Sequence, residues 1–198
     1  MLPEIQNLYD VWYPNRIAKR NESKQISFNE LTNSIISTGP FYFYIIDFFD
    51  MSLSNISPVI SQIHGFDSET VLFDDILGAI HPDDIEFVAK AEKLSTNFFY
   101  EKVGYEKMLS YKTSYNFRFR LKNGEYALFN HQSLMLSLDD DGGLGKSLNI
   151  HTRIDHLSNF NTYKVSFIGL NGEPSFMNLY ADEKNQELKE FSKREIDI

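Results

Sequence analysis

The sequence predicts an α+β fold, in which an antiparallel sheet is covered on one face by short helices. Residues 41–49, FYFYIIDFF, are aromatic and β-branched, which is typical of a buried strand. Residues 55–84 contain three helix-start signals, and residues 111–121 alternate between apolar and polar side chains as in a half-buried strand. This order, with several short helices between two groups of strands, is not that of a βαβ unit. We therefore expect helices that cross one face of an antiparallel sheet.

The composition indicates one domain with an appendage. The 198 residues are 42% hydrophobic and 15% aromatic, with 17 Phe and 11 Tyr. So many rings favour a sheet-rich core or a wide apolar cavity, although AT-rich codon usage enriches the same residues. The net charge of −9 disfavours nucleic-acid binding by bulk electrostatics, because phosphate contacts need clustered Lys and Arg.

Several functional classes lack their sequence signals. There is no Cys, which excludes thiolate metal sites and a flavin–cysteinyl site. The five His have no metal-ligand spacing, and the helix expected after Pro82 has no His to ligate haem. No glycine-rich phosphate loop or GxSxG motif is present, so we expect no catalysis. Without a membrane-length apolar run or a signal peptide, a cytoplasmic protein with no membrane association is expected.

Residues 1–37 are predicted to be a helical extension. Leu8, Val11 and Trp12 belong to one apolar stripe with helical spacing. A narrow stripe is typical of a helix that covers a neighbouring surface, in the same chain or in a second copy. We therefore assign Leu8, Val11 and Trp12 to dimerisation.

Residues 55–84 organise the predicted helices. Ser57 is expected to cap a first helix that has Pro58 at its first position and ends at Gly65. Asp67 is expected to cap a second helical turn.

A longer helix is predicted from Pro82 to about Ser95. His81 precedes it, and Asp83 and Asp84 are explained by the positive end of the helix dipole. These two carboxylates therefore need no catalytic role.

Three strands are predicted to follow as a meander, at residues 111–121, 126–138 and 146–154. Asn123-Gly124 predicts a type I′ turn between the first two. A second Asn-Gly turn joins residues 163–170 to residues 174–179, and the sequence leaves open whether this pair extends the sheet or packs against another domain.

Asn130 and Gln132 share a strand face with apolar residues, including Leu128 and Leu134. Buried amides cost free energy unless they are hydrogen-bonded. Either a bulge turns them outward, or they point into a cavity that holds water or a ligand.

This order of elements resembles a PAS domain over residues 38–156. The segments that carry the resemblance are NISPVISQIHGFDSETV, IHPDDIEFV, YNFRFRLKNGEYALFN and IHTRIDH. One departure is Leu128, where the family often has Trp. The resemblance implies a homodimer, and a small ligand held between sheet and helices by Tyr42, Tyr44, Phe87, Asn130 and Gln132. Which parity of the first strand faces inward is left open.

Residues 188–198 resemble the opening of a LuxR-type helix-turn-helix domain, with Ser192 as N-cap and Glu195 as its capping-box partner. The implied divisions are a helical extension at 1–37, a PAS domain at 38–157, a β-hairpin extension or linker at 158–182, and the start of a truncated helix-turn-helix domain at 183–198. DNA binding would occur only through the missing C-terminal domain.

The function expected is that of a sensory and dimerising PAS module of a transcriptional regulator. Two alternatives stay open at this point. The chain is then either a ligand-free structural PAS dimerisation module or the input domain of a signalling kinase or cyclase.

Overall fold

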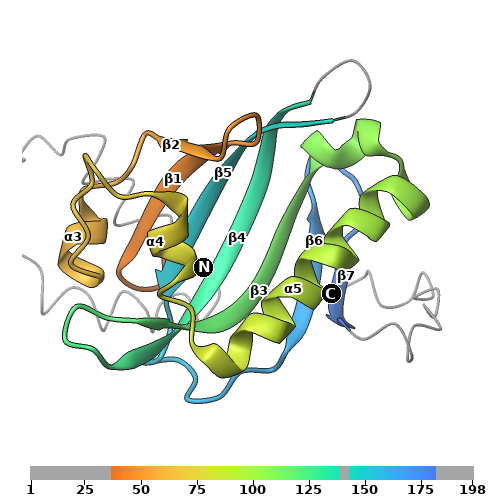
Figure 1. Cartoon of the computed structure of the whole chain (residues 1–198). Coiled ribbons are helices and arrows are strands. Elements are labelled where there is room, and N and C mark those ends of the chain that lie inside the picture. Colours follow the sequence, from red (N-terminus) through yellow and green to blue (C-terminus); the bar gives the residue numbers. More distant parts are fainter. Residues whose placement is uncertain (1–36, 139–142, 182–198) are drawn as a thin grey trace, which may run out of the picture. The chain divides into compact units, whose positions relative to one another are not determined.

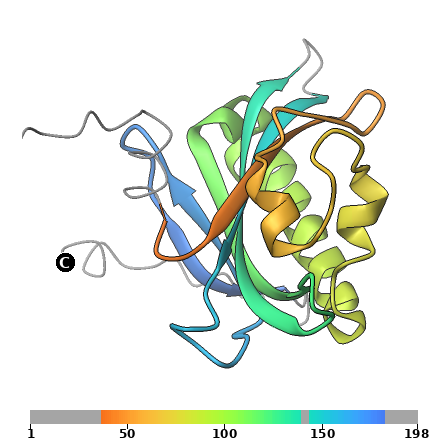
Figure 2. The ribbon, with the colours of Figure 1, turned by 90° about the vertical axis from the view of Figure 1, so that its left-hand side faces the viewer.

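The computed structural model describes residues 37–138 and 143–181 (Figure 1). The described residues form an α+β fold with one antiparallel sheet, as predicted, and helices cross one face of that sheet (Figure 2). The dimerisation residues Leu8, Val11 and Trp12 and the tail at 183–198 lie outside the described residues, so those assignments stay predictions.

The elements follow the expected order β-β-α-α-α-β-β-β, with a β-hairpin after it. They are β1 (Phe41–Asp47), β2 (Ser52–Ser54), α3 (Val59–Ile63), α4 (Phe73–Leu77), α5 (Pro82–Asn97), the π-helical η2 (Phe98–Val103), the 3₁₀-helical η3 (Tyr105–Ser110), β3 (Tyr111–Arg120), β4 (Tyr126–Leu138), β5 (Leu144–Arg153), β6 (Lys164–Gly169) and β7 (Phe176–Tyr180).

The strand order across the sheet is β2-β1-β5-β4-β3-β6-β7, with every neighbouring pair antiparallel. The β6–β7 hairpin pairs with β3, from Tyr111 opposite Gly169 to Tyr115 opposite Val165. The question left open by the sequence is thereby answered, because this hairpin extends the sheet. Its Asn-Gly turn has positive φ at both Asn171 and Gly172, as a type I′ turn requires.

The first two helices differ in detail from the prediction. α3 begins at Val59, and Ser57 contributes its backbone carbonyl, which accepts from the Ile60 N–H at 3.1 Å, rather than a side-chain cap. Gly65 ends this region with φ +82, as expected. Asp67 caps only a turn, by accepting from the Glu69 N–H at 2.9 Å.

The second helix is α4, which begins after Leu72 rather than at Asp67. Its start is stabilised by Asp75, whose carboxylate accepts from the Leu72 N–H at 2.9 Å.

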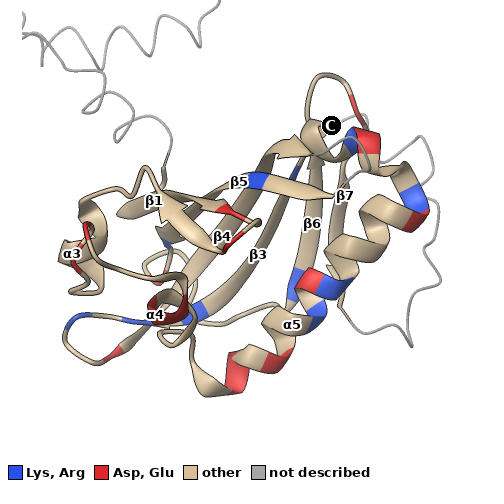
Figure 3. Cartoon of the chain, turned by 45° about the horizontal axis from the view of Figure 1, so that its top comes forward, with Lys and Arg blue, Asp and Glu red and all other residues tan. Residues whose placement is uncertain are grey.

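α5 begins as predicted, with Pro82 at its first position. His81 Nδ1 accepts from the Asp83 N–H at 3.1 Å, and acidic residues gather at this helix start (Figure 3). The helix continues into η2 and stops before Gly104, which has φ +92. α5 lies over β3, and α3 lies over β1 at the other end of the sheet (Figure 1).

The turn between β3 and β4 is not the predicted type I′ turn. Gly124 has φ +87, but Asn123 is absent from the positive-φ residues of the described chain. The Gly124 N–H donates to the Leu121 carbonyl at 2.9 Å, and the Leu121 N–H donates to the Glu125 carbonyl at 2.7 Å. The loop is therefore residues 122–124, one residue longer than a two-residue type I′ loop.

This longer loop decides which face each side chain of β4 occupies. Tyr115 lies opposite His131, whereas a two-residue loop would have placed Gln132 there. Because β-strand side chains alternate, a shift of one residue moves every side chain to the other face. Asn130 and Gln132 therefore lie on the face away from the helices, which corrects their assignment to a cavity between sheet and helices.

The amides of Asn130 and Gln132 are satisfied on that outer face without a bulge. Asn130 Nδ2 donates to the Ser114 hydroxyl at 2.9 Å and to Asn116 Oδ1 at 2.8 Å. Gln132 Nε2 donates to Asn130 Oδ1 at 2.8 Å.

Rings fill the core at both ends of the helical layer. Below α3, Tyr42, Phe119 and Phe129 are almost completely buried, and the His64 ring packs against all three. Below η2, Phe98 stacks on Phe167 of β6 with ring centroids 3.9 Å apart. The β6–β7 hairpin thus shares the core of the domain.

Candidate functional site

A cavity of about 310 Å³ lies beneath the second half of α5, next to η2. Its described lining residues come from α5, η2, η3, three strands and the loop ends. They are Phe48, Glu92, Ser95, Thr96, Phe99, Tyr100, Met108, Tyr111, Thr113, His131, Ser133, Met135, Leu144, Ser147 and Asn149.

Small polar side chains make room for the cavity on the floor of the sheet. Thr113 of β3, Ser133 of β4 and Asn149 of β5 lie directly opposite one another across the strands. In the neighbouring row, large rings take the equivalent places, as Tyr115, His131 and His151. The change from large to small side chains along the strands therefore marks where close packing ends.

His131 forms one wall of the cavity and is buried, as is His151 beside it, with ring centroids 4.8 Å apart. Burial lowers the pKa of His131 to about 3, and burial also lowers the pKa of His151 well below its usual range. Both imidazoles are therefore neutral at pH 7. Nδ1 of each ring has no hydrogen-bond partner in the described part of the chain.

Glu92 of α5 is the charged group of the cavity lining, as far as the chain is described. Its carboxylate accepts a hydrogen bond from the Tyr115 hydroxyl. The Glu92 side chain is exposed to solvent, although it lines the cavity and many protein atoms lie around it. Desolvation by these atoms raises the pKa of Glu92, and the Tyr115 hydrogen bond only partly opposes that shift.

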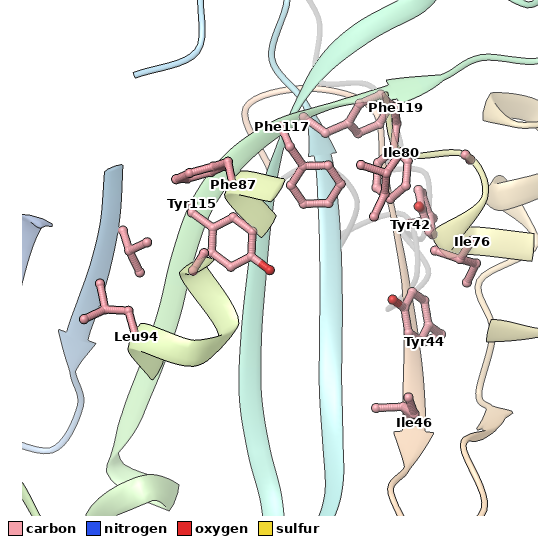
Figure 4. Close-up of a cluster of buried hydrophobic side chains, with 14 of the residues drawn as sticks. Tyr42, Tyr44, Ile46, Ile76, Ile80, Phe87, Leu94, Tyr115, Phe117 and Phe119 are labelled. Atoms are coloured by element: carbon pink, nitrogen blue, oxygen red, sulfur yellow. The ribbon is translucent and has the colours of Figure 1, made fainter. Parts of the chain in front are cut away.

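Two tyrosines lie close to Glu92. The hydroxyls of Tyr44 and Tyr115 point toward one another from opposite sides of the core (Figure 4). Burial, and then the negative charge of Glu92, raise the pKa of both phenols well above 10. Both hydroxyls therefore keep their protons, and Tyr44 also lies 3.2 Å from Nε2 of His151.

None of the five residues predicted to bind a ligand lines this cavity. Tyr42 and Tyr44 face the helices, together with Ile46, which answers the question of parity for β1. Phe87 packs edge-on against Tyr115 and Tyr163 at the side of the site. Tyr42, Tyr44 and Phe87 therefore lie on the cavity side of the sheet, but Asn130 and Gln132 do not.

Sequence reasoning missed Glu92 and His131 as site residues. Glu92 lies beside the buried stripe of α5, four residues after the partly buried Val88 and three before the buried Ser95, and this spacing was visible in the sequence. His131 was hidden by the expected turn type, because its face depends on the register of the β3–β4 hairpin.

Within residues 37–138 and 143–181, no group of three or more His, Asp or Glu residues is placed to hold a metal ion. No helix of these ranges is long and apolar enough to span a membrane.

Comparison with known proteins yields structural similarities alone. No protein-family model matches the sequence, and no curated protein matches it. Similar solved structures include the N-terminal domain of a diguanylate cyclase with PAS/PAC sensor from Marinobacter aquaeolei, at 17% identity and a TM-score of 0.45, over 59% of this chain and 96% of that chain.

Two further examples have the same degree of similarity. A sensory box histidine kinase/response regulator from Burkholderia thailandensis is 16% identical with a TM-score of 0.47, over 67% of this chain and 88% of that chain. The PAS domain of a protein from Colwellia psychrerythraea is 11% identical with a TM-score of 0.44, over 66% of this chain and 99% of that chain.

Proposed function

We propose that residues 37–181 act as a PAS-like sensory module, which binds a small molecule in the cavity beneath α5 and passes its occupancy to an output domain. The observation that carries this proposal is the cavity itself. Its volume of about 310 Å³ is at the lower end of the roughly 300–1,000 Å³ of small-molecule pockets. The element order β-β-α-α-α-β-β-β, which motivated the resemblance to PAS domains, supports the same interpretation.

The lining of the cavity suits a ligand with both polar and apolar parts. Thr113, Ser133 and Asn149 lie on paired strands, so their polar groups are held in place before any ligand arrives. Asn149 Nδ2 already donates to the Ser147 hydroxyl at 2.9 Å, and the acceptor sites that remain on these side chains can bond to a ligand. Rings and thioether groups from η2, η3 and the strand ends surround this polar floor.

The wall of the cavity connects directly to the C-terminal hairpin. Phe99 of η2 lines the cavity, and its neighbour Phe98 stacks on Phe167 of β6. Phe98 also packs edge-on against Phe176 of β7, at a centroid distance of 5.1 Å. A ligand that shifts η2 would therefore shift the hairpin that precedes residues 182–198.

The output that we propose is a helix-turn-helix DNA-binding domain of a transcriptional regulator. Its support is the resemblance of residues 188–198 to the start of a LuxR-type domain. Gel-shift assays with the full-length gene product test this part. We expect DNA binding that changes with ligand, and a kinase or cyclase activity without DNA binding would contradict it.

Ligand binding is tested by thermal shift against a metabolite library, followed by native mass spectrometry of the hits. A ligand at 100 times its Kd stabilises a protein by about 2.7 kcal/mol, which shifts Tm measurably. Ser133→Leu fills the cavity and should abolish the shift, whereas Gln132→Leu, on the opposite face of the same strand, should preserve it. Flat responses from the unmodified chain would instead support a ligand-free structural module.

A further inference from the structure

We propose that the cavity selects a small organic cation, an amine on a ring-sized apolar body, whose ammonium group pairs with the carboxylate of Glu92. This inference rests on the proposed function and adds the chemical class of the ligand.

The charges around the cavity favour a cation. Glu92 is ionisable and acidic, whereas the described lining contains no Lys or Arg. His131 adds no positive charge, because burial keeps its imidazole neutral at pH 7. The whole chain has a net charge of −9, which attracts cations and repels anions over a longer range.

The hydrogen-bonding capacity of Glu92 points the same way. An ionised carboxylate offers about four acceptor sites and no donor. Tyr115 uses one of these sites on Oε1, and as a protonated phenol it remains a donor. An ammonium group carries only donors, so it complements the sites that remain. A ligand carboxylate would instead face a like charge.

The apolar wall suits the body of such a ligand. Phe99, Tyr100 and Tyr111 contribute rings, and Met108 and Met135 contribute flexible thioether side chains. Aromatic faces attract cations, and methionines adapt to irregular shapes. The volume of about 310 Å³ equals on the order of ten water molecules at about 30 Å³ each, which leaves room for one ring with a short arm.

The charge of Glu92 should make binding depend on pH. Burial raises the pKa of Glu92 in the unliganded protein, and a neighbouring ammonium lowers it again. The titratable groups that face Glu92 are Tyr115 on β3, Tyr44 on β1 and His131 on β4. Both phenols stay protonated and the imidazole stays neutral near pH 6, so Glu92 is the group of this set that gives binding its pH dependence.

The test is isothermal titration of the full 198-residue chain with three ligands of similar shape: 2-phenylethylamine, 2-phenylethanol and 3-phenylpropanoate. We expect the amine to bind at least tenfold more tightly than the alcohol, and the carboxylate to bind most weakly. Titrations at decreasing pH should show weaker binding of the amine alone, because protonation removes the negative charge of Glu92. These measurements need no variant, so they do not depend on whether a substituted chain folds.

Two matched variants locate the effect. Glu92→Gln keeps the size and the acceptor for Tyr115. It should lower the affinity for the amine at least tenfold, remove the pH dependence of amine binding, and leave the affinity for the alcohol unchanged. Glu86→Gln on the same helix removes a carboxylate that pairs with Lys90 at 2.8 Å outside the cavity, and it should behave as the unmodified chain.

The outcomes separate this inference from the proposed function. Tighter binding of the alcohol or the carboxylate would overturn the cation class, while the cavity would still be a ligand site. If none of the three binds, the class is also overturned, and the library screen with Ser133→Leu then decides independently whether the cavity binds ligands at all.

Discussion

The carboxylate of Asp84 accepts three hydrogen bonds from Arg118. The backbone N–H of Arg118 donates to Oδ2 at 2.7 Å, Nε donates to Oδ2 at 3.0 Å, and a terminal guanidinium nitrogen donates to Oδ1 at 2.6 Å. Asp84 is fully buried, and Tyr163 adds a fourth bond at 3.2 Å. The sequence interpretation gave Asp84 only the role of a dipole partner, but the structure shows that it also ties α5 to β3.

Replacing Asp84 should destabilise the domain. Asp84→Ala removes the buried carboxylate that accepts three hydrogen bonds from Arg118, and loss of one member of a buried ion pair costs about 3 kcal/mol. Asp83→Ala, at an exposed neighbour in the same helical turn, removes a dipole interaction and an exposed ion pair with Arg118 at 3.8 Å, which should cost less than about 1 kcal/mol. Urea unfolding of both variants measures the difference, and equal losses would contradict this role of Asp84.

On acidification, the protein should begin to lose stability at pH values higher than those at which carboxylates titrate. The pKa of His131 is about 3 in the folded state and about 6.5 in an unfolded chain. Neutral His131 therefore makes its full contribution to the free energy of unfolding above pH 6.5, and this contribution is lost as the pH falls toward 3. At pH 5 the loss is about 2 kcal/mol, at 1.36 kcal/mol per pH unit.

His131→Gln should remove this part of the pH dependence, whereas His156→Gln, at an exposed position, should retain the full dependence. Urea unfolding between pH 7 and pH 5 compares the two variants. A slope in His131→Gln equal to that of the unmodified chain would show that other groups cause the acid sensitivity.

The contact between Phe98 and Phe167 should make the C-terminal hairpin essential for stability. Phe167→Ala deletes a completely buried ring and should cost about 4 kcal/mol. Phe160→Ala serves as control, because 66% of Phe160 is exposed, and should cost less than about 0.5 kcal/mol. A mild effect of Phe167→Ala in thermal unfolding would mean that the hairpin folds independently of the core.

Residues 1–37 are predicted to hold a dimer together. Leu8→Asp combined with Trp12→Asp should leave a folded monomer in light scattering, because two charges would replace part of the apolar stripe. Gln6→Asp combined with Asn7→Asp adds the same charge off the stripe and should leave a dimer. A dimer that survives the first pair of substitutions would exclude this interface.

Most of the fold was predictable because its signals are local. The alternation from Tyr111 to Arg120 predicted β3 and its inward face, and the bounds of β4 agree with the predicted residues 126–138. Pro82 and Gly65 set a helix start and a helix end through backbone restrictions that act over a few residues.

The cavity was less predictable because it depends on register. Asn123 keeps a negative φ while its side chain accepts from the Glu125 N–H at 3.1 Å, so the usual Asn-Gly rule did not apply. Both faces of β4 carry apolar residues, such as Leu134 on the outer face. The hydrophobic pattern therefore did not show which face of β4 points toward the helices. The inward position of His131 could therefore not be deduced from the pattern alone.

The place of β1 in the sheet has a consequence for synthesis on the ribosome. Within the described sheet, β1 has only the three-residue β2 on one side, and its long pairing is with β5, from Phe41 opposite Thr152 to Asp47 opposite Lys146. At about 5–20 residues per second, the roughly 100 residues between these partners take on the order of 10 s to translate. Throughout that interval the aromatic strand emerges without its partner, so chaperone binding to nascent chains should be strongest between the appearance of β1 and that of β5.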